Sequence, residues 1–119
     1  MDEIPKLSHE KLHVYQKSVE FLALSAQITS SLPRGNGELV DQLKRAALSV
    51  PLNIAEASGR TGSADNAKHF AIARGSALES GAIVDAYHAL RLIDAETYSV
   101  AKRLIVSMVS MLSKLCMKK

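Results

Sequence analysis

The hydrophobic and polar positions of the chain repeat with the period of an α-helix in four long segments. Residues of about 9–31, 37–58, 63–93 and 94–119 carry apolar side chains in steps of three and four. In the first segment the main apolar stripe consists of Leu12, Tyr15, Val19, Leu22 and Ala26, with a second set beside it of Val14, Phe21, Leu24 and Ile28. In the second segment the stripe consists of Leu39, Leu43, Ala46, Val50 and Ile54. No segment shows the alternation expected of a strand, so we predict an all-α protein.

Glycine and proline cluster in the links after the first and second segments, where turns are expected. Gly59 suits a left-handed helix C-cap, and both Ser63 and Asp94 suit helix N-caps. Short links favour antiparallel neighbours. We therefore predict one antiparallel up-and-down four-helix bundle over residues 9–119, preceded by a loose N-terminal arm of residues 1–8.

The fourth segment carries more apolar surface than one side of a bundle requires. Two adjacent stripes follow it, one of Leu104, Met108, Met111 and Leu115 and the other of Ile105, Val109, Leu112 and Cys116. A central helix that is covered on most sides would explain this pattern. So would a helix with one stripe on the core and the other on a neighbouring subunit. Because symmetric homo-oligomers are common, we favour the second explanation.

The third segment carries a stripe of mostly small side chains. Its members are Ala71, Gly75, Leu78, Ala82, Ala86 and Ala89. Gly75 and Gly81 each cost about 1 kcal/mol relative to alanine inside a helix. Small side chains allow another backbone to approach closely, so we expect tight helix packing along this stripe.

The composition is that of a folded cytoplasmic protein. The 119 residues are 47% hydrophobic and 23% charged, which is ordinary globular usage. No apolar run approaches the roughly 20 residues that a membrane span needs, and the acidic N-terminus does not resemble a secretory signal. Cys116 is the only cysteine, which excludes an intrachain disulfide and a multi-cysteine zinc site. We expect no metal and no cofactor.

A polar stripe lies beside the apolar stripe of the second segment. It consists of Arg45, Ser49, Asn53, Glu56 and Arg60, which are spaced by four, four, three and four residues and so share one side of a helix. A solvated face with an ion pair between Glu56 and Arg60 explains such a stripe. Spacing alone favours that explanation.

The run Gln42–Arg60, which contains this stripe and Pro51, closely resembles the signature of a bacterial four-helix-bundle family, the 23S rRNA intervening-sequence proteins. A second run, Phe70–Glu79, resembles another signature of that family. The departures are mild: Ala57 stands where glycine is usual, and Lys44 stands where arginine is usual. The resemblance extends over nearly the whole chain.

The resemblance implies a ring-like homopentamer and supplies no catalytic activity. It also implies that Ser76 and Glu79 of the third segment belong with the polar stripe of the second. We therefore predict that Asn53, Glu56 and Arg60 meet Ser76 or Glu79 in space. Such a cluster would be a structural lock if buried and a binding site if exposed.

The expected function is that of a non-enzymatic, homo-oligomeric scaffold or binding module for a protein partner. The alternative is an RNA- or DNA-binding accessory protein that uses a basic surface of the oligomer. The net charge of +3 is too small to decide, and a chain with two Phe, three Tyr and no Trp has few rings for base stacking. The candidate nucleic-acid contacts are Lys44, Arg45, Lys102, Arg103, Lys114, Lys118 and Lys119. A second alternative is an enzyme with Glu56 and Glu79 as an acid–base pair, although no nucleophile or cofactor motif accompanies them.

Overall fold

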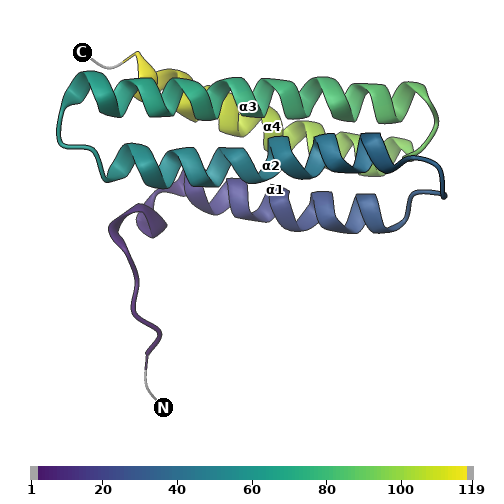
Figure 1. Cartoon of the computed structure of the whole chain (residues 1–119), viewed down its shortest axis with the longest axis horizontal. Helices are drawn as coiled ribbons and strands as arrows, with labels where there is room; N and C mark the ends of the chain where they lie inside the picture. Colours follow the sequence, from purple (N-terminus) through teal and green to yellow (C-terminus); the bar gives the residue numbers. More distant parts are fainter. Residues whose placement is uncertain (1–2, 118–119) are drawn as a thin grey trace.

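The computed structural model describes residues 3–117 as four long antiparallel helices joined by short links (Figure 1). A short 3₁₀ helix precedes them. The elements are η1 (Ser8–Lys11), α1 (His13–Ser30), α2 (Gly37–Ser58), α3 (Ser63–Ala89) and α4 (Ala95–Cys116). The predicted all-α, up-and-down four-helix bundle is confirmed.

The helices follow one another around the bundle in chain order. Helix α1 contacts α2 and α4, and helix α3 also contacts α2 and α4. Within the described residues no Cα atom of α2 lies within 8 Å of one of α4, and the same holds for α1 and α3, so each of these pairs lies on a diagonal. The 3₁₀ helix η1 packs against α1 and α2. Any surface on α4 is therefore remote from a surface on α2.

Helix α1 turns a different face to the core from the one its main apolar stripe predicts. Val14, Phe21 and Ile28 are buried, whereas Val19 is 42% exposed. Two serines lie on the same buried face: Ser18 donates its hydroxyl hydrogen bond to the carbonyl of Tyr15 (2.6 Å) and Ser25 donates to that of Phe21 (2.9 Å). A serine hydroxyl that bonds to its own helix is satisfied without an outside partner. A hydrophobic pattern therefore assigns these two serine positions to the polar face, although they belong to the core.

Helix α2 follows its predicted stripe. Leu43, Ala46, Val50 and Ile54 are buried, and Leu39 packs against them at the edge of the core. The helix continues through Pro51, whose side chain is also buried.

The small-residue stripe of α3 lies on the outside of the subunit, so the tight packing predicted along it is wrong for a single chain. Ala71, Gly75, Leu78 and Ala82 are exposed, and a Cβ atom built on Gly75 meets nothing within 4 Å. Helix α4 approaches α3 at Gly81 instead, where a Cβ atom would lie 3.4 Å from Cγ2 of Ile105. The core face of α3 consists of Phe70, Ala73, Ala77, Ser80, Gly81, Ile83, Val84 and Tyr87.

The two apolar stripes of α4 do not divide between core and surface. Leu104 and Met108 of one stripe and Ile105 and Leu112 of the other are all buried, because the seam between the stripes points to the centre of the bundle. Val106, which belongs to neither stripe, is 62% exposed.

Two of the predicted helix caps differ from those observed, and α1 begins at His13, after the separate 3₁₀ helix η1. Gly59 has a φ of −84°, so it is not a left-handed cap, and Ser63 is the first residue of α3, after Gly62 as the N-cap. Asp94 is the predicted N-cap of α4, and its carboxylate accepts a hydrogen bond from the Thr97 amide (2.7 Å).

Helix α3 ends at Ala89, four residues before the predicted end. Arg91 adopts the left-handed conformation (φ 62°), and the Leu92 amide donates to the Tyr87 carbonyl (2.9 Å). The Arg91 amide donates to the His88 carbonyl, which completes a Schellman motif. Glycine is the usual residue at this position. Because arginine stands here instead, the sequence did not indicate that the helix ends at Ala89.

We expect the buried face of α1 to show in the free energy of unfolding. Phe21→Ala removes a fully buried ring and leaves a cavity, which should cost about 3–5 kcal/mol. Val19→Ala, on the stripe that the sequence favours, should cost less than about 1 kcal/mol because Val19 is exposed. Urea unfolding of the two variants measures both values. Equal losses would place both residues in the core and contradict the observed rotation of α1.

Candidate functional site

A polar seam joins α2 to α3 on one side of the bundle. The hydroxyls of Ser49 and Ser76 share a hydrogen bond of 2.8 Å across the two helices. Asn53 donates from Nδ2 to the carbonyl (2.9 Å) and the hydroxyl (3.0 Å) of Ser49. All three side chains are half-buried. The bond between Ser49 and Ser76 therefore links the two helices, and Asn53 supports it from within α2.

The antiparallel register of α2 and α3 decides which members of the predicted polar set meet. Ser49 lies opposite Ser76, and further along Asn66 donates to the carbonyl of Ala57 (2.8 Å). Two residues that face each other in this region thus have numbers whose sum is about 125. This register places Glu56 opposite residue 69 and Arg60 opposite residue 65.

The prediction that Glu56 and Arg60 meet Ser76 or Glu79 is therefore wrong, and the part concerning Asn53 holds only through Ser49. Glu56 and Arg60 form an ion pair with each other, and both side chains are about half exposed. Glu79 is exposed and forms no hydrogen bond or ion pair within residues 3–117. The position opposite Glu56 is ten residues from Glu79, or about 15 Å along the helix. Such a separation excludes an acid–base pair of Glu56 and Glu79.

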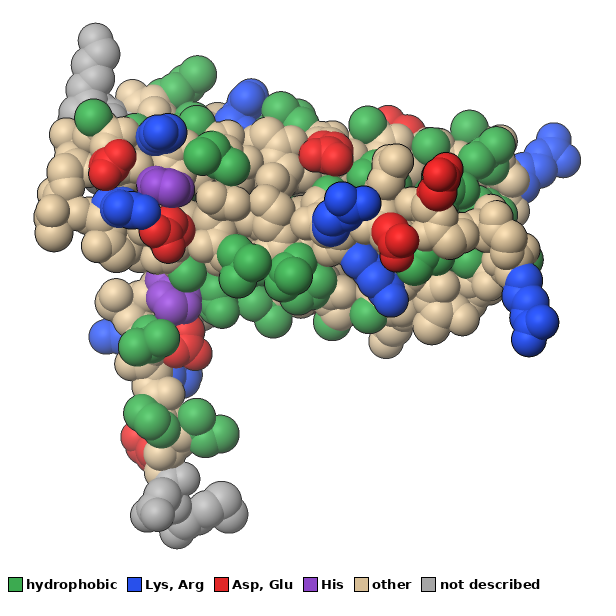
Figure 2. Space-filling model, in the orientation of Figure 1, with side chains coloured by type: hydrophobic (Ala, Val, Ile, Leu, Met, Phe, Trp, Pro, Cys, Tyr) green, Lys and Arg blue, Asp and Glu red, His purple; other side chains and the backbone are tan. Residues whose placement is uncertain are grey.

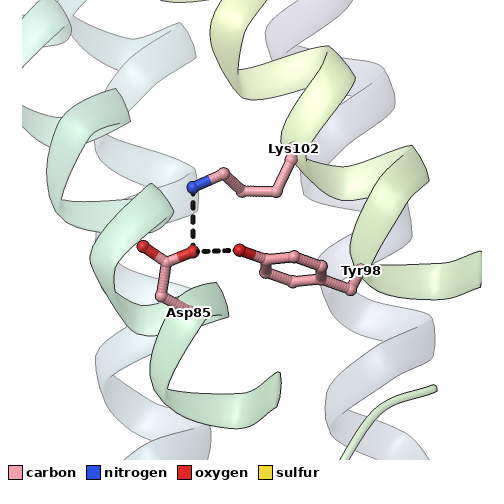
Figure 3. A network of polar contacts seen from close by, with 3 residues as sticks. All are labelled: Asp85, Tyr98 and Lys102. Atoms are coloured by element: carbon pink, nitrogen blue, oxygen red, sulfur yellow. Dashed lines mark hydrogen bonds and ion pairs between the residues drawn. The ribbon is translucent and has the colours of Figure 1, made fainter. Parts of the chain in front are cut away.

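A second polar cluster, which the sequence interpretation missed, bridges α3 and α4 (Figure 3). One carboxylate oxygen of Asp85 accepts hydrogen bonds from the Tyr98 hydroxyl (2.7 Å) and the Lys102 ammonium (2.8 Å). The His88 ring stacks on Tyr98 at a centroid distance of 4.0 Å. The signal available in the sequence was the spacing of Tyr98 and Lys102 by four residues, which places both on one side of α4.

The charges of this cluster shift one another's pKa. Hydrogen bonds from Lys102 and then Tyr98 lower the pKa of Asp85 below its ordinary value. The hydrogen bond to Asp85 raises the pKa of Lys102 and also that of Tyr98. The cluster therefore holds a carboxylate and an ammonium together at neutral pH.

Two apolar hollows lie beside this cluster and flank a ridge of α4 made by Lys102, Val106 and Ser110. The first, of about 490 Å³, lies between the helices and is lined further by Leu78, Gly81, Ala82, Asp85, Ile105 and Val109. The second, of about 710 Å³, is a shallow, open depression on the outer side of α4 alone, beyond the ridge, and is lined further by Tyr98, Ser99, Arg103, Ser107 and Met111. We call the two hollows and their ridge the α3/α4 groove. With Leu78 47% and Val106 62% exposed, the groove presents apolar surface to its surroundings.

The predicted nucleic-acid contacts do not gather on one face of the subunit. Lys44 and Arg45 are exposed on α2, whereas Arg103 and Lys114 are exposed on α4, across the diagonal of the bundle. Lys102 is engaged with Asp85. Lys118 and Lys119 lie outside the described residues. One face of the molecule shows basic and acidic side chains interspersed rather than a basic field (Figure 2).

Residues 3–117 contain no group of three or more His, Cys, Asp or Glu side chains placed to hold a metal ion. Cys116 is half-buried, and its thiol faces the carbonyl of Ser113 at 3.7 Å. None of the helices in this part of the chain has the length and hydropathy needed to cross a membrane.

The lowered pKa of Asp85 predicts that part of the free energy of unfolding is lost at acidic pH. Because the folded protein lowers the pKa of Asp85, its stabilising effect is present above the ordinary carboxyl pKa and is lost as the pH falls through the lowered value. Asp85→Asn should cost up to about 1 kcal/mol at pH 7, since the pair is partly exposed. The difference from the original chain should shrink between pH 5 and pH 2.

Urea unfolding at several pH values measures this difference. Glu79→Gln is the matched control, because this exposed carboxylate has no partner in the described structure. A cost of Asp85→Asn that stays the same at every pH would contradict the assignment.

Comparison with known proteins agrees with this architecture. The family model described as 23S rRNA-intervening sequence protein matches residues 10–114. A crystal structure of a protein of unknown function from the S23 ribosomal protein family of Bacteroides thetaiotaomicron superposes with a TM-score of 0.81. The two sequences are 22% identical, and the superposition covers 88% of the present chain and 99% of the crystallised protein, so the likeness shows the fold. No curated protein matches the chain. Since the family model covers most of its length, the chain belongs to the family of 23S rRNA-intervening sequence proteins.

Proposed function

We propose that the protein is a non-enzymatic, homo-oligomeric scaffold, built as a ring of five copies, that binds a protein partner. The observation that carries this proposal is the large apolar surface left outside the core. Leu78 and Val106 stand exposed over the α3/α4 groove, and Leu48 (44%) and Leu52 (59%) stand exposed on α2. Contiguous exposed apolar surface favours an interaction site over a free monomer.

The positions of these two apolar patches favour a ring. The patch of Leu48 and Leu52 belongs to α2, and the centre of the α3/α4 groove, Val106, belongs to α4, the helix diagonal to it. A subunit with two different adhesive surfaces on different sides joins its neighbours head to tail, and such an assembly closes when the rotation between copies permits. The number of five copies follows from the resemblance to the family.

The exposed members of the polar set are the candidates for partner binding. Ser49, Asn53 and Ser76 satisfy one another within the seam, so they serve the fold. Arg45 and Glu79 are exposed near the α2 and α3 faces of this seam, and the ion pair of Glu56 and Arg60 continues the surface along α2. Alternating charges of this kind suit a protein partner of complementary pattern better than a uniformly anionic nucleic acid.

The assembly state is the first test. Light scattering at micromolar concentration should return the mass of a pentamer. Val106→Glu should lower that mass while the helical circular dichroism persists, because a charge in the α3/α4 groove opposes its burial between copies. Val100→Glu is the matched control, on the same helix and 40% exposed but outside the groove, and it should leave the mass unchanged. A monomer mass for the unaltered chain would overturn the proposal.

Partner binding is tested with the exposed ion pair. Glu56→Ala and Arg60→Ala should each change the free energy of unfolding by less than about 1 kcal/mol, because both side chains are exposed. Both variants should keep the oligomer mass and lose a partner that the unaltered chain retains in a pull-down from its host. Glu20→Ala removes a comparable surface pair with Lys17 on α1 and should keep the partner.

Nuclease treatment separates the two functional classes in the same pull-down. A partner that survives nuclease supports the protein-binding scaffold. Partners released by nuclease, with binding that weakens steeply as salt rises, would favour the nucleic-acid accessory instead. Retention of every partner by both variants would exclude this ion pair from the binding site.

A further inference from the structure

The N-terminal arm, residues 3–7, stands away from the bundle and carries apolar side chains into solvent (Figures 1 and 2). Ile4 is 85% exposed and Leu7 is 66% exposed. Pro5 restricts its own φ and disfavours a helical conformation at Ile4, so this part of the arm is biased toward extended structure. The arm has the chemistry of a short binding peptide.

The root of the arm is anchored, although its tip is not. The Leu7 amide donates to the carboxylate of Glu10 (2.6 Å), and the His9 ring meets the edge of Tyr15 at a centroid distance of 4.6 Å. These contacts set the direction in which the chain leaves the bundle. An anchored root lowers the entropy lost when the tip docks, because part of the arm is already ordered.

The arm is placed on the side of the bundle remote from the α3/α4 groove. Its root, η1, packs on α1 and α2, and in the described structure none of its Cα atoms lies within 8 Å of a Cα atom of α3 or α4. Ile4 lies four residues before Ser8, a reach of at most about 14 Å even when fully extended. With its root on α1 and α2, the arm leaves its own bundle on the side away from the α3/α4 groove.

The backbone of the arm matches the two hollows of the groove. Leu7 has φ −89° and ψ 160°, close to polyproline II geometry. A segment that kept this geometry from Ile4 to Leu7 would complete one turn of about 9 Å in three residues, which would place both side chains on the same side. The groove offers two adjacent apolar hollows on either side of Val106. Such a pair of hollows can receive the side chains of Ile4 and Leu7 together.

The arm carries Glu3 and Lys6, and the groove carries Asp85 as well as its basic side chains, so the two surfaces offer one complementary pair, Glu3 and Arg103. Glu3 is exposed next to Ile4 at the tip of the arm. Lys102 and Arg103 line the groove, and Arg103 is exposed, with a hydrogen bond to the Ser99 hydroxyl (2.9 Å) but no ion pair among the described residues. A carboxylate beside this guanidinium would gain a charge-assisted hydrogen bond.

We propose that the N-terminal arm of one copy docks in the α3/α4 groove of the next copy, with Ile4 and Leu7 in the hollows beside Val106 and Glu3 beside Arg103. The proposal rests on the homo-oligomeric assembly and names the surfaces that join its subunits. Donor and acceptor lie on different sides of each subunit, so every copy gives one arm and receives one. This is the head-to-tail contact that closes into a ring.

Disulfide trapping tests the contact in the full-length chain. With Cys116→Ser as the background, a chain that carries both Ile4→Cys and Val106→Cys should form a ladder of covalent oligomers under mild oxidation. Chains that carry one change each should form a covalent heterodimer when they are refolded together. Ile4→Cys with Val100→Cys is the matched control and should not link, because Val100 lies outside the groove.

The outcomes separate this proposal from the assembly itself. Absence of the ladder in a variant that light scattering shows to be oligomeric would overturn the arm contact and leave the scaffold standing. A disulfide within one chain, or dimers formed by Val106→Cys alone, would also overturn it, since the groove would then bind its own arm or a second groove. A monomer mass would overturn both proposals.

Charge exchange gives an independent measure. Glu3→Lys should raise the subunit concentration at which the oligomer dissociates by about two- to five-fold, the effect of one partly exposed ion pair. Arg103→Glu should do the same, and the two changes together should restore the original value. Losses that simply multiply in the double variant would contradict the pairing of Glu3 with Arg103.

Discussion

The pairing of α2 with α3 is the contact on which the arrangement of this protein depends. Small buried side chains on both helices, among them Ala46, Ala47 and Ala77, permit close packing. The hydrogen bond between Ser49 and Ser76 then selects the register, because any sliding of the helices would separate two half-buried hydroxyls. That single register places Asn53 in the seam and leaves Glu56 and Glu79 far apart.

The same packing separates side chains that serve the fold from those that are free to bind. Hydroxyls and amides on the inner part of the seam have partners within the chain, whereas the charged side chains at its margin remain in solvent. On the opposite edge of α3, Asp85 pairs with Lys102 and Tyr98 beside an apolar groove. An ion pair at the end of such a groove fixes the position of its polar rim without filling its apolar hollows.

The diagonal placement of the helices gives the subunit two unlike sides. The arm and the exposed leucines Leu48 and Leu52 belong to the side of α1 and α2, and the α3/α4 groove belongs to the other. Because these apolar side chains lie on the outer faces of their helices, the core of a single four-helix bundle does not bury them. In the proposed homo-oligomer, association between copies would cover them, and unlike sides favour a closed ring over a symmetric pair.

Much of this fold could be predicted from the sequence, because the helical period, the turns and the cap at Asp94 depend on residues close together in the chain. The family could be recognised for the same reason, since its signatures are local runs. The rotation of α1 could not be predicted: Ser18 and Ser25 satisfy their own hydroxyls, and only packing against the other helices shows that these positions are buried. The end of α3 was equally hidden, because Arg91 occupies a position usually marked by glycine.

The sequence by itself determined that α2 has a polar side, that α3 carries a stripe of small residues and that α4 carries two adjacent apolar stripes. Only the tertiary structure decided which of these residues meet. Periodicity states the direction of a side chain around its own helix, but it carries no information on the axial register or the facing partner. Register and neighbour order are properties of the packed bundle. They place Ser49 against Ser76 and keep Glu56 away from Glu79. They also place Val106 at the centre of a groove.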